Sequence, residues 1–336
     1  MTRSVLVTDF AWPTLEPERR ILAEIDAEIV VAETGDEDEL VELVGEVDAI
    51  LTNWKPVTAR VLRGAPRCLT VARYGVGLDN IDVAAATELG IVVCNVPGFC
   101  IDEVSDHALA LVLALSRHIV DFAGQTSAGG WDNKGFGEMH RLRGQTLGLV
   151  GFGRIARRVA AKAQAFGFDV LAYSPSLTPG EHDGVTAASF EGVLASSNVV
   201  SLHAPSTPST RHMIGPAQLA MMRPGAFLVN TARGALVDEE ALRSALVEGI
   251  LGGAGLDVMD EEPPPPDHPL RNTPGVVMTP HASFYSVEAL DELQQTAAAN
   301  VVAVLGGHFS PTVVNPEVLA SSVLRAPMQT FDAGPR

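Results

Sequence analysis

The chain has 336 residues, and 41 acidic against 23 basic residues give it a formal net charge of −18. Its length, about twice that of a typical domain, predicts two domains. Nucleic acid and anionic membranes would repel such an acidic surface, so we expect neither as a partner. Hydrophobic residues make up 46% of the chain and aromatic residues only 5%. Cores of Ala, Val, Leu and Ile favour parallel sheets covered by helices.

The beginning of the chain and its cysteines bear on location. A strand is already predicted at 5–7, and no apolar stretch reaches the roughly 20 residues of a membrane span, so we expect neither a signal peptide nor a membrane helix. Cys68, Cys94 and Cys100 lack metal-ligand spacing. We therefore expect a reduced, cytoplasmic protein without a metal site.

The first hundred residues alternate short apolar runs with helical patterns. Helices are predicted at 16–25 and 37–44, between the first strands. This is the βαβ rhythm of a doubly wound parallel sheet. The predicted strands are 5–7, 29–31, 49–51, 69–72 and 91–94.

A long helix is predicted next, with Asp102 as its N-terminal cap and apolar residues at helical spacing as far as Ile119. Residues 124–140 are rich in glycine and lack periodicity, which predicts a loop.

A second alternating series begins at Gln145, with a helix predicted at 155–166. Ser286 is placed to cap one more helix, which runs to about Leu305. The predicted strands of this series are 146–150, 170–173, 199–202, 226–230, 253–256 and 276–278.

Two βαβ series predict an α/β protein with two doubly wound parallel-sheet domains. If the last helix packs on the first series, one domain comprises 1–100 and 286–336 and the other comprises 101–285. We expect a cleft between them, because ligands bind at domain interfaces and at the carboxyl ends of parallel strands.

The strongest local motif lies between a predicted strand and a helix. Gly151 permits a tight turn, Gly153 lets the backbone approach a pyrophosphate, and Ala156 allows close helix–strand packing. The amides of Arg154 and Ile155 would face the phosphates from the helix start. The motif predicts a dinucleotide site in the domain 101–285.

The residue after the next strand should be acidic to bind both ribose hydroxyls of NAD, but here it is Ser174. A 2′-phosphate would not be repelled there, yet residues 175–181 offer no Arg or Lys to hold it, which leaves Arg154 as the candidate to reach it. We expect NAD or NADP, with NAD slightly favoured.

Five motifs together resemble the D-isomer-specific 2-hydroxyacid dehydrogenases, most closely the branch that is similar to C-terminal-binding proteins and phosphoglycerate dehydrogenases. They lie at residues 73–82, 151–156, 230–234, 257–263 and 279–282. The resemblance implies a flavodoxin-like substrate domain (1–100 and 286–336), a Rossmann-like cofactor domain (101–285) and a homodimer formed through the cofactor domain.

By this resemblance the catalytic residues are Arg233, Glu262 and His281, and Asp257 binds the nicotinamide carboxamide. Motif and resemblance together give these candidate cofactor contacts: Val76, Gly151, Gly153, Arg154, Ile155, Ser174, His203, Ala204, Pro205, Thr210, Thr231, Asp257 and His281. The candidate substrate contacts are Arg73, Gly75, Val76, Arg233 and Phe284.

These residue types suit the reversible reduction of a 2-oxo acid to a D-2-hydroxy acid. A histidine can transfer the proton, a carboxylate can orient it and favour its charged form, and an arginine can clamp the substrate carboxylate. Glu262 favours this chemistry, since formate-type members of the superfamily carry Gln there. His107 is expected to have a structural role on its helix.

Two features leave the substrate open. Phe284 stands where the most similar branch has Trp, and Arg73 adds a second positive group that suits a second carboxylate, a phosphate or the first carboxylate. Glyoxylate, hydroxypyruvate, phosphorylated and aliphatic oxo acids all fit. The alternative hypothesis is a dinucleotide-sensing dimeric interaction protein, similar to a co-repressor, with little turnover.

Overall fold

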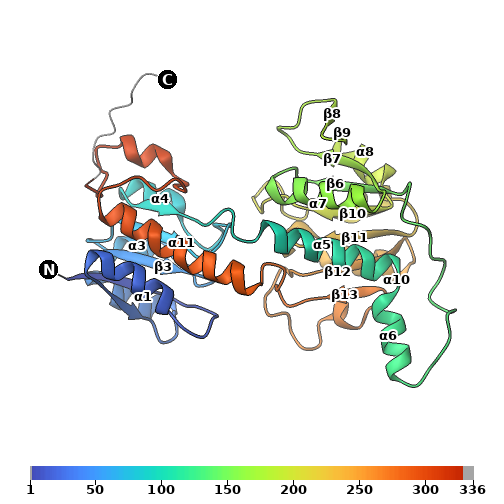
Figure 1. Cartoon of the computed structure of the whole chain (residues 1–336), viewed down its shortest axis with the longest axis horizontal. Helices are drawn as coiled ribbons and strands as arrows, with labels where there is room; N and C mark the ends of the chain where they lie inside the picture. The colour runs from blue at the N-terminus through green and yellow to red at the C-terminus, as the bar shows by residue number, and fades with distance from the viewer. Residues whose placement is uncertain (1, 328–336) are drawn as a thin grey trace. The chain divides into compact units, whose positions relative to one another are not determined.

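A computed structural model describes residues 2–327. The chain divides into two compact units, Met1–Phe99 with Ser286–Arg336, and Cys100–Tyr285. Each unit contains one sheet with helices on both faces (Figure 1). Residues 1 and 328–336 of the predicted first domain lie outside the described part of the chain.

The sheet of the first unit has five parallel strands in the order β2-β1-β3-β4-β5. The chain direction across the sheet reverses between β1 and β3, which makes their carboxyl ends a topological switch point. All five predicted strands are confirmed: β1 (Arg3–Val7), β2 (Ala27–Val31), β3 (Ala49–Thr52), β4 (Thr70–Arg73) and β5 (Val92–Cys94).

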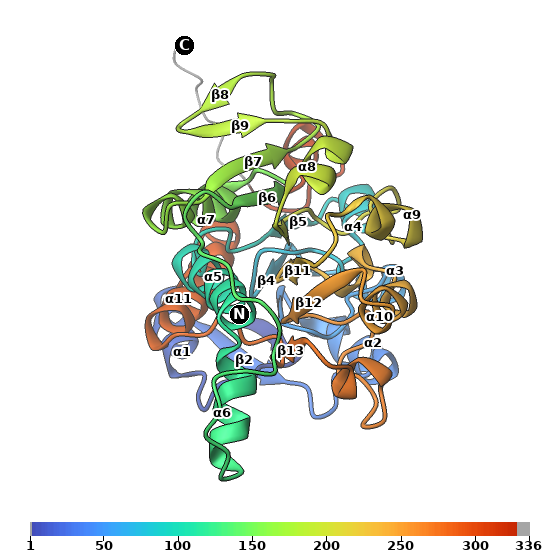
Figure 2. The same ribbon diagram turned by 90° about the vertical axis from the view of Figure 1, so that its right-hand side faces the viewer.

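Helices α1 (Glu16–Leu22) and α11 (Val287–Leu305) cover one face of this sheet (Figure 2). The other face carries α2 (Glu37–Leu43), α3 (Ala59–Arg63) and α4 (Val83–Glu88). The predicted cap is confirmed, because Ser286 Oγ accepts a hydrogen bond of 2.9 Å from Ala289 N. The predicted helices 16–25 and 37–44 end in the 3₁₀ turns Ala23–Ile25 and Val44–Glu46.

The sheet of the second unit has the order β13-β12-β11-β10-β6-β7-β9-β8, and only β8 is antiparallel to its neighbour. The chain direction reverses between β6 and β10, which gives this unit its own switch point. The strands are β6 (Thr146–Val150), β7 (Asp169–Tyr173), β8 (Glu181–His182), β9 (Val185–Ala187), β10 (Val199–Leu202), β11 (Ala226–Asn230), β12 (Leu251–Leu256) and β13 (Val276–Met278). The six predicted strands are confirmed, whereas β8 and β9 are too short to show a periodicity.

Helices α5 (Ile101–Ser116) and α7 (Arg154–Ala165) pack together on one face of this sheet. The opposite face carries α8 (Phe190–Ser196), α9 (Pro216–Met221) and α10 (Glu239–Val247), as Figure 2 shows. The two faces bury separate apolar clusters, one around Leu149 and one around Leu228. The prediction of two α/β units with parallel sheets is confirmed.

Two expectations for the long helix are wrong. The N-terminal cap is Cys100, and Asp102 lies in the first turn, where its carboxylate pairs with Arg158 of α7. The helix ends at Ser116, because His118 adopts a left-handed conformation with φ +49°. A second helix, α6 (Ile119–Ser127), then begins.

The loop predicted at 124–140 is also wrong over its first four residues, which belong to α6. The ring of Phe136 packs edge-on against that of Phe122, with 5.0 Å between centroids. This contact holds the loop after α6 against the helix. It joins residues 14 positions apart, so no local sequence pattern predicts it.

Within residues 2–327, no single helix is long and apolar enough to cross a membrane. Only α5 and α6 together meet that length and composition, and they are bent by 64° at their junction.

The loop before α2 generates a prediction about acid stability. The Glu39 carboxylate accepts hydrogen bonds from the amides of Glu33, Thr34 and Gly35 and from the Thr34 hydroxyl, which lowers the pKa of Glu39 to about 2. The ionised form therefore stabilises the fold above the usual glutamate pKa, and this contribution is lost as pH falls toward 2. Glu39→Gln should lower the thermal midpoint at pH 7, and the difference from wild type should shrink between about pH 5 and 2.

Glu42→Gln makes the same chemical exchange at an exposed position of α2 and serves as the control. Differential scanning calorimetry across this pH range gives the comparison. An equal effect of Glu39→Gln at every pH would contradict the assigned cause.

Candidate active site

A glycine turn follows β6 at the switch point of the second unit. Gly151 has φ +92°, and a Cβ there would lie 2.6 Å from the carbonyl carbon and oxygen of His203, which follows β10. The Gly151 amide donates to Tyr173 O at 2.8 Å. The turn therefore requires glycine, because a side chain would meet backbone that cannot move aside.

The first turn of α7 can receive an anion. The helix has 12 residues, and its N-cap, Gly153, provides no side-chain hydrogen bond to the first amides. A Cβ at Gly153 would meet nothing within 4 Å, so this position faces open space beside the amides of Arg154 and Ile155. Ala156 is fully buried and packs closely, as its small size predicts. The helix start thus fits a dinucleotide pyrophosphate.

Further candidate cofactor contacts line the carboxyl ends of β7, β10 and β11. Ser174 Oγ lies 3.2 Å from Ser176 Oγ. His203 Nε2 lies 2.9 Å from Ser201 Oγ, and enclosure of the ring lowers the pKa of His203 to about 4, so it is neutral at pH 7. Thr231 Oγ1 is buried with no hydrogen-bond partner among residues 2–327, which leaves a polar group available to a ligand.

The segment after His203 is held in shape by one of its own hydroxyls. Thr210 Oγ1 donates to Pro205 O at 2.7 Å and accepts from the Thr207 amide at 2.8 Å. The structure therefore gives the segment from Ala204 to Thr210 a defined turn at the switch point.

His281 and Glu262 are in direct contact. His281 Nδ1 lies 2.6 Å from Glu262 Oε2, and Glu262 Oε1 accepts a 2.8 Å hydrogen bond from Met259 N. Because an ionised carboxylate only accepts, Nδ1 must carry the proton. The other ring nitrogen, Nε2, is then the one that can exchange a proton with a substrate.

Asp257 fixes the loop that carries His281. His281 has φ +51°, a left-handed conformation that costs a side-chain-bearing residue about 1–2 kcal/mol. Its amide donates to Asp257 O at 2.8 Å, and the amides of Ala282 and Ser283 donate to the Asp257 carboxylate at 2.9 and 3.0 Å. These bonds hold the strained conformation in place.

Arg233 follows β11, in a turn held by Asn230. The Asn230 side chain donates to Arg233 O at 2.8 Å and accepts from Ala232 N at 3.0 Å. A Cβ at Gly234 would lie 1.9 Å from the carbonyl carbon of Met259, so glycine lets this turn approach the segment that leads to Glu262. Asn230 belongs to the motif at 230–234, yet sequence reasoning assigned it no role, although a buried Asn at the end of an apolar strand is a usable signal.

The second unit therefore brings the three predicted catalytic residues to one edge of its sheet. Arg233, Glu262 and His281 follow β11, β12 and β13, which are neighbours in that order. The ring of Phe284 lies edge-on to that of His281, with 6.2 Å between centroids.

The first unit holds the remaining predicted substrate residues. The Arg73 guanidinium lies 5.8 Å from the centre of the Trp54 ring. Val96 N donates to Gly75 O at 2.9 Å and Asn95 Nδ2 to Val76 O at 2.8 Å. These two carbonyls are turned toward the segment that follows β5. The amides of the same peptide groups point the opposite way, because a trans peptide places N–H and C=O on opposite sides.

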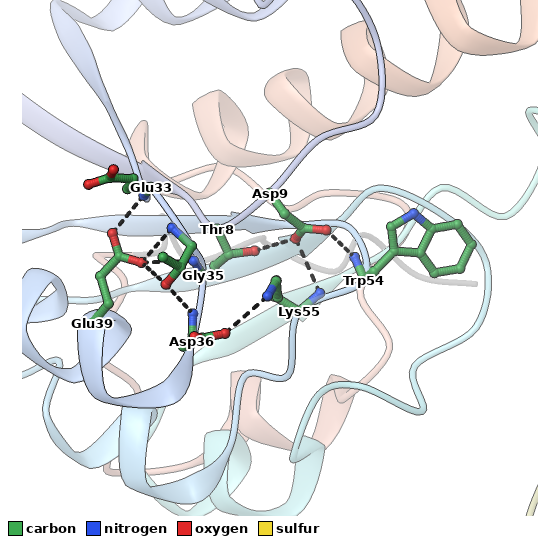
Figure 3. A network of polar contacts seen from close by, with 9 residues as sticks. Thr8, Asp9, Glu33, Gly35, Asp36, Glu39, Trp54 and Lys55 are labelled. Carbon is green, nitrogen blue, oxygen red and sulfur yellow. Dashed lines mark hydrogen bonds and ion pairs between the residues drawn. The ribbon is translucent and has the colours of Figure 1, made fainter. Parts of the chain in front are cut away.

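Asp9, which sequence reasoning did not single out, shapes the loop that presents Trp54. Its carboxylate accepts from the amides of Asn53, Trp54 and Lys55 at 3.1, 2.8 and 3.2 Å, as Figure 3 shows for the last two. Thr8 Oγ1 adds a fourth bond of 2.8 Å. Asp9 thus fixes the loop after β3 at the switch point of the first unit.

Among residues 2–327, no three His, Cys, Asp or Glu side chains are grouped so that they could hold a metal ion.

A mostly parallel sheet with a glycine turn at its switch point and a histidine–carboxylate pair at its carboxyl edge is typical of a nicotinamide-dependent oxidoreductase. Residues 109–283 match the model of the D-isomer specific 2-hydroxyacid dehydrogenase NAD binding domain. The chain belongs to the D-isomer-specific 2-hydroxyacid dehydrogenase family. Its relatives support activity as an NAD(P)-dependent 2-hydroxyacid dehydrogenase that acts on CH–OH donors.

Three similar proteins illustrate this relationship. A glyoxylate reductase of Thermococcus litoralis is 41% identical over 84% of this chain and 88% of its own length. A D-3-phosphoglycerate dehydrogenase of Mycobacterium leprae is 42% identical over 83% of this chain, which spans 53% of that relative. The structure of an NADPH-dependent glyoxylate/hydroxypyruvate reductase from Sinorhizobium meliloti, in complex with NADP and malonate, has a TM-score of 0.84 and 29% identity, covering 98% of this chain and 100% of that one.

The open position at Gly153 generates a prediction about cofactor binding. Gly153→Ala should leave the thermal midpoint of the free protein near wild type, because its φ of −83° is ordinary and the methyl group meets no protein atom. The methyl group should still weaken NADH or NADPH binding about tenfold or more, because it occupies space beside the phosphate-binding amides.

Gly45→Ala introduces a methyl group at another open position, in the first unit, and should leave cofactor binding unchanged. Isothermal titration calorimetry of the three proteins makes the comparison. Undiminished cofactor affinity in Gly153→Ala would show that the pyrophosphate does not lie there.

Proposed function

We propose that this protein reversibly reduces a small 2-oxo acid to the D-2-hydroxy acid, with His281 as acid/base, Glu262 as its partner and Arg233 as the substrate clamp. The observation that carries the proposal is the 2.6 Å contact between His281 Nδ1 and Glu262 Oε2. It leaves Nε2 as the proton-exchanging atom at the edge where Arg233 also emerges.

A nicotinamide cofactor, when bound, supplies or accepts the hydride. His281 Nε2 gives a proton to the carbonyl oxygen in reduction and takes it from the hydroxyl in oxidation. The negative charge of Glu262 stabilises the imidazolium form, which must be present before reduction. The Met259 amide fixes the Glu262 carboxylate, so the imidazole does not have to reorient during the proton transfer.

Arg233 is assigned to the substrate carboxylate and the carbonyl oxygen. Its guanidinium can donate two parallel hydrogen bonds and polarise the carbonyl, which a lysine cannot do in the same way. The Asn230 side chain fixes the backbone from which Arg233 extends. We keep Arg73, Gly75, Val76 and Phe284 as further substrate contacts, with the outward-turned amides after Gly75 as donors to the carboxylate.

The cofactor residues fit either NAD or NADP, with NAD slightly favoured. Ser174 and Ser176 form a neutral, hydroxyl-lined end to β7 that would accept ribose hydroxyls and would not repel a 2′-phosphate. The Sinorhizobium meliloti relative was solved with NADP. Asp257 is assigned to the carboxamide and Thr231 to a second polar contact of the cofactor.

The proposed substrate class is small 2-oxo acids, with glyoxylate first. The support is the glyoxylate reductase relative, which matches over most of both chains, whereas the phosphoglycerate dehydrogenase relative extends well beyond this chain. Phosphorylated oxo acids stay in the test because Arg73 could serve a second anionic group.

The first test is turnover of NADH and NADPH at 340 nm against glyoxylate, hydroxypyruvate, phosphohydroxypyruvate and aliphatic 2-oxo acids. We expect turnover of at least one small oxo acid. Glu262→Gln should lower kcat about 10²-fold with that acid, because a neutral amide does not stabilise the imidazolium.

Glu261→Gln makes the same exchange at the neighbouring exposed acid and is the control. If the wild type binds cofactor but turns over none of the acids, the enzyme proposal fails in favour of a dinucleotide-sensing protein. If the wild type is active and Glu262→Gln is equally active, the assigned proton pathway is wrong.

We also propose that the protein is a homodimer formed through the cofactor domain and acts in the cytoplasm. Exposed apolar side chains support the dimer, with Ile119, Val120 and Trp131 showing 54%, 51% and 91% exposure. Cys68, Cys94 and Cys100 form no disulfide within residues 2–327 and would stay reduced in the cytoplasm. Light scattering should give about twice the chain mass of 35.4 kDa, and a value equal to the chain mass would contradict the dimer.

A further inference from the structure

His107 is a half-buried histidine that the proposed mechanism does not use. It lies on α5, one helical turn before Leu111, and Leu111 packs so closely on β12 that a Cβ at Gly255 would lie 2.9 Å from Leu111 Cβ. Residues four apart share a helix face, so His107 reaches the end of the same strand. That end is Asp257.

His107 joins a short chain of hydrogen bonds. Its Nε2 lies 2.8 Å from Thr279 Oγ1, and Thr279 Oγ1 lies 2.6 Å from Asp257 Oδ1. His107 Nε2 is also 3.6 Å from Asp257 Oδ1. The chain of hydrogen bonds therefore runs from α5, through the start of the His281 loop, to the carboxylate of Asp257, a residue that is 1% exposed.

The chemistry of these groups fixes the direction of each bond. An ionised carboxylate only accepts, so the single hydroxyl proton of Thr279 goes to Asp257. The Thr279 oxygen must then accept from His107, which requires a proton on Nε2. Thus His107 determines where the Thr279 hydroxyl points, and the hydroxyl in turn restrains one oxygen of Asp257.

The second oxygen of Asp257 keeps capacity for a ligand. Among residues 2–327, Oδ1 accepts from Thr279 and from the Ala282 amide, whereas Oδ2 accepts from the Ser283 amide alone. Each carboxylate oxygen can accept about two hydrogen bonds, so Oδ2 can take one more donor. A primary amide supplies such a donor.

We propose that His107 is a positioning residue for cofactor recognition: through Thr279 it orients Asp257 so that Oδ2 accepts the N–H of the nicotinamide carboxamide. This inference rests on the proposed function, which assigns Asp257 to that carboxamide. His107 itself does not touch the cofactor in this proposal. Its effect is on selectivity, that is, on how much more tightly the protein binds a cofactor with an amide than one whose corresponding group lacks an N–H donor.

The test compares binding of two cofactors that differ in this donor. One is NADH, or NADPH if it binds more tightly. The other is the corresponding reduced 3-acetylpyridine dinucleotide, in which a methyl ketone replaces the amide. Isothermal titration calorimetry gives both dissociation constants without turnover. Wild type should prefer the amide by about tenfold or more, because a hydrogen bond to a charged acceptor is worth this much.

His107→Phe should reduce this preference to about twofold or less, mainly by weakening binding of the amide form. His107→Gln should restore most of it, because a glutamine side chain can place an N–H donor near the original Nε2. Thr279→Val should reduce the preference for the amide cofactor as much as His107→Phe does. The double variant His107→Phe/Thr279→Val should show no further loss of this preference, because both changes break the same chain of hydrogen bonds.

His308→Phe makes the same exchange at an exposed position outside the cofactor unit and should keep the wild-type preference. Thermal unfolding of each free protein separates loss of fold from loss of recognition, and His107→Gln keeps the test valid if the phenylalanine variant unfolds. Equal weakening of both cofactors in His107→Phe would mean a merely structural role and would overturn the inference.

Two further outcomes are decisive. A wild-type preference retained in His107→Phe would also overturn the inference, while leaving the carboxamide assignment of Asp257 intact. Absence of any preference in wild type would remove that assignment and the inference with it. Neither result depends on the oxo-acid panel, so failure of the proposed reaction would be seen separately.

Discussion

The site depends on one buried carboxylate, that of Asp257. A carboxylate removed from water is costly unless donors surround it. In the described part of the chain, its three hydrogen-bond donors all come from the segment between Thr279 and Ser283. Satisfying this charge forces the segment into a tight loop with His281 at φ +51°. The strained backbone places the imidazole against Glu262. The geometry of the contact between His281 and Glu262 is therefore a consequence of how the segment after β13 satisfies the charge of Asp257.

The order of the strands brings the other residues of the candidate site together. Because β11, β12 and β13 are parallel neighbours, residues far apart in sequence emerge side by side at their carboxyl ends. Local contacts then fix the shape of each loop. The Asn230 side chain holds the turn before Arg233, and Gly234 permits close approach to the backbone at Met259. The sheet supplies proximity, and the hydrogen bonds of polar strand-end side chains supply the final geometry.

Apolar runs and the glycine turn could be predicted because their signals are local: each main strand of both sheets and the Ser286 cap follow from patterns within a few residues. The missed elements depend on distant partners or are very short. Asp102 has the character of a cap, but Arg158 of α7 takes its carboxylate, and α6 continues because Phe136 folds back on it. Asp9 acts on the backbone amides of residues 53–55, and no local pattern connects it with that distant loop.

The acidic composition predicts repulsion of anions, yet the proposed substrate and cofactor are both anionic. The structure resolves this conflict, because the acids at the strand ends are already neutralised locally. Asp9 accepts three backbone amides, Asp257 two amides and a hydroxyl, and Glu262 an amide and an imidazole N–H. Each carboxylate fixes its own loop through these hydrogen bonds. Its negative charge is largely balanced by the donors and contributes little to the electrostatic potential beyond that loop. Arginine side chains and the amides at the start of α7 then set the local potential, so net charge describes the surface of this protein and not its site.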